Sequence, residues 1–341
     1  MKRWYLYPFS LVYHFVTAMR NRMYDWGIFS STKFKTPIIG VGNLSVGGSG
    51  KSPMVMYMAD LLSKNFRTGV LSRGYGRKTK GYGIVNYEST YKMVGDEAMQ
   101  LFERFRNRFV IGVCEDRVFG ARKIIDDMDL DVLLLDDSYQ HRRIKPGFNI
   151  LLTDYNDPYF KDFLLPAGNL RESRRGAKRA DLIVVTKCPE ILTEEKKQFY
   201  INKIKPRHYQ KVFFSSINYD ENVVNKRQQI PVQNLNYYDI LLVTGIANPS
   251  LILKELQKYT PKIKHLKYGD HHSFTLADID NIKKEYQKLG EYRIILTTEK
   301  DFVRLKYFDF MREKIYYWPI NVEIDRKEEF DQIIENYVRK N

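Results

Sequence analysis

The sequence has 341 residues, of which 43% are hydrophobic and 28% charged, and its formal net charge is +15. This is the composition of an ordinary globular protein, and the length predicts two domains. The positive charge implies an anionic partner: a nucleic acid, an anionic membrane surface or a phosphorylated substrate. Cys114 and Cys188 lie far apart and outside any CxxC motif or His/Cys cluster, so a disulfide framework or a zinc site has no support and a reducing cytoplasm is the default expectation.

The first 30 residues contain an aromatic segment, residues 4–19, that carries no formal charge. Lys2 and Arg3 precede it, and Arg20 and Arg22 follow it. The segment is shorter than the roughly 20 apolar residues that a spanning helix needs, and no small-residue cleavage site follows it. Two interpretations stay open: a helix lying in the membrane interface, which the basic surplus favours, and a first helix packed on the protein's own core.

A glycine-rich loop at residues 40–53 follows a short apolar run and precedes a segment with helical apolar spacing. A loop between strand and helix can bind phosphate through backbone N–H groups and the helix start, with the Lys51 charge and a Ser52 hydroxyl for Mg²⁺. Ser45 stands where the strict pattern has glycine, and a plain glycine-rich turn is the alternative. The predicted phosphate-binding residues are Gly47, Gly48, Ser49, Gly50, Lys51 and Ser52.

A second glycine-rich loop follows the short strand that begins near residue 67. Its Arg73 and Arg77 either clamp a second anionic group or lie in a solvated turn. Farther along, Asp96 directly precedes a helix that runs through Phe105. It is either the N-cap of this helix or a base that faces the nucleotide cleft.

The apolar run at residues 132–135, which follows Asp131, predicts a buried parallel strand that ends in Asp136 and Asp137. Together with the upstream glycine loop, this strand resembles the one with which P-loop enzymes present the aspartate that organises Mg²⁺. Gln140 and His141 follow at the carboxyl end, where open α/β sheets bind ligands. The basic run at residues 171–179 either is a solvated face or binds an anionic substrate.

Strands and helices alternate up to residue 187, which predicts an α/β fold with a doubly wound, mostly parallel sheet. A smaller α/β unit begins near residue 239, and an alternating strand at 315–324 is predicted to pair with 212–219 as a two-stranded hinge. The predicted organisation is an N-terminal amphipathic membrane-associating helix (1–30), a P-loop kinase domain (31–211), a hinge strand and linker (212–237), a smaller α/β domain (238–314), and a return strand with a C-terminal helix (315–341).

The second unit carries two adjacent histidines, His271 and His272, in the loop before a helix. A capping-box pattern, Thr275 followed by Asp278, marks the start of this helix. Loop histidines are usually exposed, but one next to Asp270 could orient a catalytic carboxylate if the domains close.

Seven motifs occur in a fixed order along the chain: 42–53, 72–77, 94–97, 136–141, 166–172, 270–274 and 298–301. In this order they resemble the tetraacyldisaccharide 4'-kinases, the lipid A 4'-kinases of Gram-negative bacteria. The resemblance runs from the N-terminal segment to about Arg304, and the family shares the missing glycine at Ser45. Two departures are mild: Ser52 replaces the usual threonine and Ser138 the usual glycine.

The resemblance implies an enzyme on the cytoplasmic face of the bacterial inner membrane, held peripherally against anionic lipid. It would transfer the γ-phosphoryl group of ATP to the 4'-hydroxyl of a tetraacyldisaccharide 1-phosphate, with ATP and Mg²⁺ and without nucleic acid or an obligate protein partner. The alternatives are a P-loop phosphotransferase acting on a soluble metabolite and a nucleic-acid-dependent NTPase, for which the chain shows no binding motif.

Carried over residue by residue, the resemblance makes Asp96 the carboxylate that activates the sugar hydroxyl, paired with His271, or with His272 as second choice. Lys51 would contact the phosphates, and Ser52, Asp136 and Asp137 would bind the metal. The implied substrate-binding residues are Arg73, Tyr75, Arg77, Glu97, Arg117, Gln140, His141, Asn169, Arg171 and Glu172.

Overall fold

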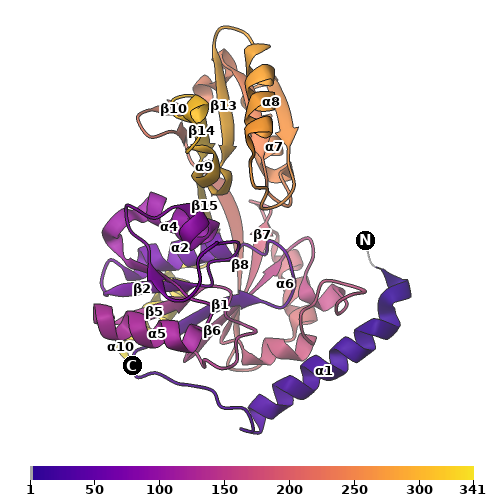
Figure 1. The fold of residues 1–341 in the computed structure, drawn as a ribbon. Helices are drawn as coiled ribbons and strands as arrows, with labels where there is room; N and C mark the ends of the chain where they lie inside the picture. The colour runs from indigo at the N-terminus through magenta and orange to yellow at the C-terminus, as the bar shows by residue number, and fades with distance from the viewer. Residues whose placement is uncertain (1–2) are drawn as a thin grey trace.

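The computed structural model describes residues 3–341, which form two sheets with helices packed on them (Figure 1). Within this range a nine-stranded sheet has the order β15-β8-β7-β6-β1-β5-β2-β4-β3, and a six-stranded sheet has the order β10-β9-β14-β13-β11-β12. The expected α/β class with a mostly parallel sheet is confirmed.

The large sheet is parallel except at its edges, where β3 pairs antiparallel with β4 and β15 with β8. Its strands are β1 (Ile38–Asn43), β2 (Thr68–Ser72), β3 (Gly83–Ile84), β4 (Val110–Val113), β5 (Val132–Leu135), β6 (Phe148–Asp154), β7 (Leu182–Cys188), β8 (Lys211–Tyr219) and β15 (Ile320–Ile324). The helices on it are α2 (Lys51–Leu62), α3 (Tyr91–Val94), α4 (Asp96–Phe105), α5 (Arg117–Met128), α6 (Glu194–Ile204) and α10 (Lys327–Arg339).

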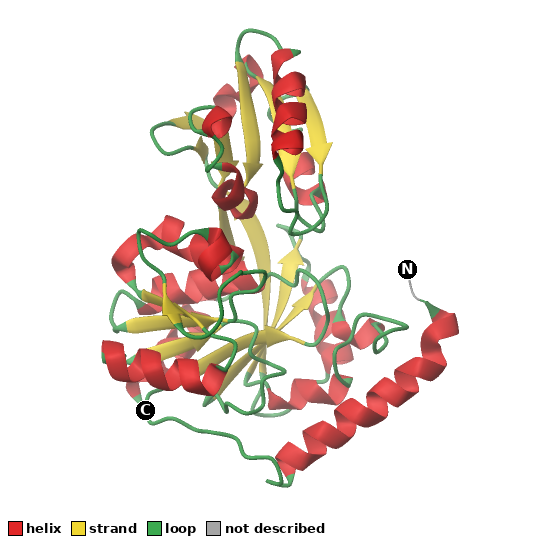
Figure 2. Ribbon diagram, viewed as in Figure 1, coloured by secondary structure: helices red, strands yellow, loops and turns green. Residues whose placement is uncertain are grey.

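Helices cover both faces of the large sheet (Figure 2), so residues on both faces of its central strands are buried. Strand β5 shows the two faces. Val132 and Leu134 pack in one cluster with α2, α4 and α10, whereas Leu133 and Leu135 pack with α5 on the other side. All four residues are fully buried. The carboxyl ends of the parallel strands therefore form one edge on which loops can gather.

The small sheet stands at one end of the molecule (Figure 1) and has helices on both of its faces. Its strands are β9 (Asn222–Val224), β10 (Gln229–Pro231), β11 (Asp239–Thr244), β12 (Ile263–Lys267), β13 (Arg293–Thr298) and β14 (Ile315–Trp318). Its helices are α7 (Ser250–Leu256), α8 (Leu276–Gln287) and α9 (Glu299–Leu305).

The return strand differs from the expectation in one respect. Instead of a single strand over 315–324, Pro319 separates β14, which joins the small sheet, from β15, which joins the large one. A proline has no N–H to donate to a strand ladder, which accounts for the break. The expected pairing with 212–219 is present in β15, where Ile320 lies opposite Tyr219 and Ile324 opposite Ser215.

The N-terminal helix α1 (Tyr7–Asp25) follows a short 3₁₀ turn at Trp4–Leu6 and lies along the large-sheet domain, away from the small sheet (Figure 1). Polar side chains hold it there: Ser10 donates to the Leu164 carbonyl at 3.0 Å and Tyr13 to the Arg171 carbonyl at 2.9 Å. The expected flanking residue Lys2 lies outside the described residues. Over residues 3–341, no helix combines the length and apolarity needed to cross a membrane.

Candidate active site

The glycine loop joins the end of β1 to the start of α2. Gly47 and Gly50 have φ angles of 105° and 79°, in the left-handed region that favours glycine, and Gly50 is the N-cap residue of α2. The Ser49 hydroxyl is buried and has no hydrogen-bond partner among residues 3–341. A loop whose backbone turns in this way at a helix N-terminus has the form of an anion site.

The loop is braced by two residues at the end of β7 that the sequence analysis did not single out. Thr186 donates through Oγ1 to the Ser49 carbonyl at 2.9 Å, and the Lys187 ammonium donates to the Gly48 carbonyl. Lys187 also pairs with Asp154, at 2.8 Å between Nζ and Oδ2. In the sequence, the only sign of this role is that both residues lie at the end of a predicted strand. Their contact with the glycine loop depends on the sheet order, in which β6 separates β7 from β1.

Lys51 opens α2 and lies beside the carboxylate pair that follows β5. Its Nζ is 3.8 Å from Oδ1 of Asp137 and 3.4 Å from Oδ1 of Asn43. Arg171 also contacts both groups, with 2.9 Å between Nη2 and Oδ1 of Asp137. The structure thus brings Lys51, Asp137 and Arg171 together, with Asn43 as a further member that was not predicted.

The two aspartates of this pair differ in their electrostatics. Burial, with the nearby charges of Asp137 and Glu97, raises the pKa of Asp136 to about 7. Burial alone would also raise the pKa of Asp137, but Lys51 and Arg171 outweigh burial and lower it to about 2. The contribution of Glu97 shows that the charge at the start of α4 acts on the aspartate pair.

The aspartate pair has features of a Mg²⁺ site. Oδ1 of Asp136 is buried and accepts no hydrogen bond from any residue in 3–341. Across the same residues there is no group of three or more His, Cys, Asp or Glu side chains that could hold a metal ion. Magnesium commonly takes one or two carboxylates and completes its shell with phosphate oxygens and water. The two carboxylates that follow β5, with a Ser52 hydroxyl in the first turn of α2, are donors of that kind.

A second cluster forms where α4 meets the small-sheet domain. Nδ1 of His271 lies 3.1 Å from Oδ2 of Asp96, and Arg304 donates to the same oxygen. Burial alone would raise the pKa of Asp96, but the hydrogen bonds from His271 and Arg304 outweigh burial and lower it. Asp96 is therefore a carboxylate. The interpretation of Asp96 as N-cap was wrong: Gly95 is the N-cap residue, and Asp96 occupies the first helical position.

The two adjacent histidines have different partners. His271 reaches Asp96 in the other domain, whereas Nε2 of His272 lies 3.0 Å from Oδ2 of Asp278 in its own domain. Asp278 also accepts from the backbone of Thr275 in the capping box at the start of α8. His272 is thus part of a helix cap, and His271 links the two domains through Asp96.

The second glycine-rich loop contributes one aromatic contact and one structural pair. The ring of Tyr75 packs edge-on against that of His271, with centroids 5.3 Å apart. Arg77 instead pairs with Glu115 at 2.7 Å and donates to the Gly81 carbonyl, so its guanidinium holds the loop together. Arg73 is exposed on this loop.

Two further predicted residues lie behind the aspartate pair. Arg117 is 3% exposed and donates to the Cys114 carbonyl at 2.6 Å and to the Asp136 carbonyl at 3.3 Å. Burial lowers its pKa to about 10. Burial, with repulsion from Arg117 and Arg73, lowers the pKa of His141 to about 4, so His141 is neutral near pH 7. Arg117 therefore supports the strand end that carries Asp136.

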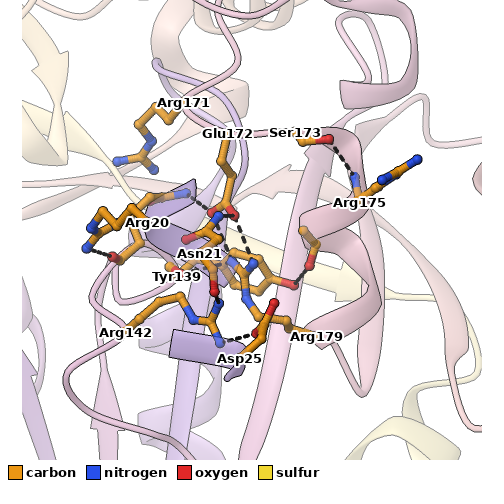
Figure 3. Close-up of polar contacts among 12 residues, drawn as sticks. Arg20, Asn21, Asp25, Tyr139, Arg142, Arg171, Glu172, Ser173, Arg175 and Arg179 are labelled. Carbon is orange, nitrogen blue, oxygen red and sulfur yellow. Dashed lines mark hydrogen bonds and ion pairs between the residues drawn. The ribbon is translucent and has the colours of Figure 1, made fainter. Parts of the chain in front are cut away.

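Glu172 connects the N-terminal helix to this strand end (Figure 3). Its carboxylate is 3% exposed and accepts from Asn21 of α1 at 3.0 Å, from Gln140 at 3.1 Å and from Arg179 at 2.8 Å. Gln140 also donates to the Asn43 carbonyl at 2.8 Å, at the end of β1. Glu172 and Gln140 thus fix the position of α1 relative to the glycine loop.

Asn169 is the remaining predicted substrate-binding residue, and it lies exposed on the loop that precedes Glu172. Its backbone carbonyl accepts from the Val46 N–H at 2.8 Å, inside the glycine loop. The 166–172 segment is therefore attached to the phosphate-binding loop through its backbone.

The family model described as Tetraacyldisaccharide-1-P 4'-kinase matches residues 2–339. The chain belongs to this family. A tetraacyldisaccharide 4'-kinase of Bacteroides thetaiotaomicron is 41% identical over 99% of this chain and 93% of its own length. One of Flavobacterium johnsoniae is 41% identical over 98% and 97%.

A solved structure is also similar, described as a crystal structure of the "apo" form of LpxK from Aquifex aeolicus in complex with ATP. Its TM-score is 0.78 at 30% identity, over 98% of this chain and 99% of that chain. The predicted family and its enzyme class, a tetraacyldisaccharide 4'-kinase of lipid A biosynthesis, are thereby confirmed. The soluble-metabolite and nucleic-acid alternatives are not favoured.

Proposed function

We propose that this chain transfers the γ-phosphoryl group of ATP to the 4'-hydroxyl of a tetraacyldisaccharide 1-phosphate and that Asp96 is the general base. The observation that carries the proposal is the Asp96 carboxylate, held at the start of α4 by His271 of the other domain. Glu97, the next residue, acts electrostatically on Asp136 beside the glycine loop. A hydroxyl between Asp96 and the loop would have a proton acceptor on one side and a phosphoryl donor on the other.

The nucleotide side is assigned to the residues at positions 47–52. Backbone N–H groups of Gly47, Gly48 and Gly50 and the unpartnered Ser49 hydroxyl receive the phosphates, and Lys51 supplies a positive charge. Ser52, Asp136 and Asp137 would hold Mg²⁺, which when bound neutralises charge on the β- and γ-phosphates. Arg171 holds Asp137 in place for this role.

In the transfer step, the 4'-oxygen forms a bond to the γ-phosphorus while the bond from that phosphorus to the ADP oxygen breaks. The hydroxyl proton passes to Asp96. The lowered pKa of Asp96 makes it a weak base, but a loose phosphoryl-transfer transition state leaves the hydroxyl proton in place until late. The first task of Asp96 is therefore to orient the hydroxyl, and His271 and Arg304 fix the carboxylate for it.

The acceptor side is assigned to the predicted substrate-binding residues around the cleft. Tyr75 and Glu97 lie next to His271. Arg73, Gln140, His141, Asn169, Arg171 and Glu172 lie on or behind the loops at the carboxyl ends of the large-sheet strands, whereas Arg77 and Arg117 shape those loops. Residues 31–211 and 238–314 form the two walls of the cleft in this proposal.

The helix within residues 1–30 is assigned to the membrane surface. Its outward side carries large apolar residues that are more than half exposed: Trp4, Tyr5, Phe9, Leu11, Val12, Phe15 and Val16. An apolar surface of this kind with Arg20 and Arg22 beside it suits an anionic interface. The protein would thus bind peripherally to the cytoplasmic face of the bacterial inner membrane, where its lipid substrate is.

The proposal is tested by incubating the full chain with ATP, Mg²⁺ and a tetraacyldisaccharide 1-phosphate in detergent and analysing the lipid by mass spectrometry. We expect a lipid with one additional phosphate, formed at least about 100-fold more slowly by Asp96→Asn. ATP hydrolysis without a phosphorylated lipid would overturn the proposal, as would ATPase activity that depends on a polynucleotide.

A further inference from the structure

The Thr298–Asp301 segment is one of the seven motifs, and the proposed reaction assigns it no role. It opens α9, with Thr298 as N-cap. Oε2 of Glu299 accepts from Gln100 at 3.1 Å and from Arg104 at 3.3 Å, both on α4. The segment therefore packs against the helix that begins with Asp96.

Lys300 of this segment reaches the far side of the His271 ring. Its Nζ lies 2.8 Å from Nε2 of His271 and 3.4 Å from Oε1 of Glu97. A lysine ammonium group has only donors, so Nε2 of the imidazole accepts. The ring is then neutral, with its proton on Nδ1, which is the nitrogen 3.1 Å from the Asp96 carboxylate.

The direction of donation is thus the same at both contacts: Lys300 donates to His271, and His271 donates to Asp96. Arg304 also lies 3.5 Å from Nδ1 of His271. When the proton is on Nδ1, both Arg304 and Nδ1 are donors, so no hydrogen bond forms between them. Arg304 donates instead to the Asp96 carboxylate. The Glu97 carboxylate also lies near Nε2, but at 3.9 Å, beyond hydrogen-bond distance, so the two close contacts of the ring, to Lys300 and Asp96, are those of an imidazole with its proton on Nδ1.

The same segment also fixes the backbone of His271. His271 has a φ of 55°, and its N–H donates to the Gly245 carbonyl at 3.1 Å. The Gly245 N–H donates at 2.8 Å to Oδ2 of Asp301, which is fully buried. Lys300 and the backbone of His271 are therefore held in one network, which keeps the ammonium aligned with Nε2.

We propose that Lys300 is a positioning residue of the kinase: it selects the tautomer of His271 that donates to Asp96. This inference rests on the proposed roles of Asp96 and His271. Without Lys300 the imidazole can carry its proton on Nε2, and a lone pair on Nδ1 then faces the carboxylate. The bond that orients Asp96 is lost, although no residue that touches the nucleotide has changed.

The test uses the full chain with Lys300→Met, which keeps an unbranched side chain and removes the donor. Lys284→Met on an exposed side of α8 is the matched control. Ring ¹⁵N chemical shifts of selectively labelled histidine report the tautomer directly, and the chain has six histidines, so His271→Gln assigns the signal. We expect an Nδ1–H ring in the unchanged chain and in Lys284→Met, and an Nε2–H population in Lys300→Met.

In kinetics, kcat of Lys300→Met should fall about 10- to 100-fold, as expected for loss of a hydrogen bond to a charged group, with KM for ATP within about twofold. Lys300→Arg keeps a side chain with donors only and should retain the tautomer and most of kcat. An unchanged tautomer in Lys300→Met overturns the proposal, and so does a raised KM for ATP at constant kcat, which would make Lys300 a nucleotide ligand.

The arginine variant also guards against a folding defect. If Lys300→Met unfolds, a tautomer change in folded Lys300→Arg would overturn the proposal, and an unchanged tautomer would support it. The NMR measurement needs no lipid substrate. If the chain transfers no phosphate to lipid, the proposed function fails, while the tautomer still decides the role of Lys300.

Discussion

Arg304 and Asp96 form an ion pair across the two domains, with Nη2 of Arg304 donating to Oδ2 of Asp96. The Arg304 side chain is 2% exposed, and its Nη1 donates at 3.1 Å to the His272 carbonyl. One guanidinium thus holds the proposed base and the histidine loop together.

Arg304→Leu should lower the free energy of unfolding by about 3 to 5 kcal/mol, because it leaves Asp96 and Asp301 buried beside an apolar side chain. Urea unfolding followed by tryptophan fluorescence measures this loss. Arg339→Leu, at the exposed end of α10, is the control and should change stability by less than about 0.5 kcal/mol. A loss in Arg304→Leu no larger than in the control would contradict the ion pair's structural role.

Lys51 and Asp96 should separate nucleotide binding from turnover. Lys51→Ala removes the positive charge beside the glycine loop, so both ATP affinity and kcat should fall. Asp96→Asn keeps the shape of the side chain and loses the base, so kcat should fall about 10²- to 10⁴-fold at unchanged ATP affinity. Calorimetric titration with ATP and initial-rate kinetics measure the two quantities. Equal loss of ATP affinity in both variants would contradict the assignment of Asp96 as the general base.

Substitution of the two adjacent histidines should have different effects, on kcat for His271 and on stability for His272. His271→Gln loses the contact to Asp96, and its kcat should fall at least about tenfold. His272→Gln loses its partner Asp278 in the helix cap, so it should lower stability by about 1 kcal/mol while kcat stays within about threefold. Comparing kcat with the thermal midpoint of each variant checks this. A loss of kcat confined to His272→Gln would reverse the assignment.

The sequence predicted the parts of the fold that depend on local patterns. Strand β5 is apolar at every position because both faces of the sheet are covered, and such a run is visible in one dimension. The proline at position 319 is visible in the sequence, but the assignment of the strands on either side of it to two different sheets is not. A proline disrupts a ladder, yet nothing local says that the two halves join different sheets.

The site was predicted less completely, because its charges find partners far along the chain. In the sequence, Arg77 has the features of an anion-binding residue, because it lies in a basic, glycine-rich loop. Only the fold shows that its guanidinium forms an ion pair with Glu115. Spacing cannot separate His271 from His272, because only the fold shows that His271 meets Asp96 of the other domain and His272 meets Asp278 of its own. Lys300 was part of a recognised motif, but its role depends on the position of the His271 ring.

The last prediction concerns the outward side of α1. Phe9 and Phe15 are 64% and 66% exposed, and burying one phenylalanine in an apolar medium is worth about 1.5 to 3 kcal/mol. The double variant Phe9→Ser, Phe15→Ser should therefore bind vesicles containing anionic lipid at least about tenfold more weakly, measured by co-sedimentation. Phe119→Ser on α5, where the side chain is 50% exposed, is the matched control and should bind as before.

Ser10 and Tyr13 face the protein and stay intact in this double variant, so α1 keeps its anchors to the loop at 164–171. Phosphate transfer to substrate dispersed in detergent should therefore change by less than about threefold, while transfer to substrate embedded in vesicles falls with binding. Equal vesicle binding by the double variant and the unchanged chain would show that another surface meets the membrane. Loss of activity in detergent as well would show that the two phenylalanines support the fold or contact the lipid substrate directly.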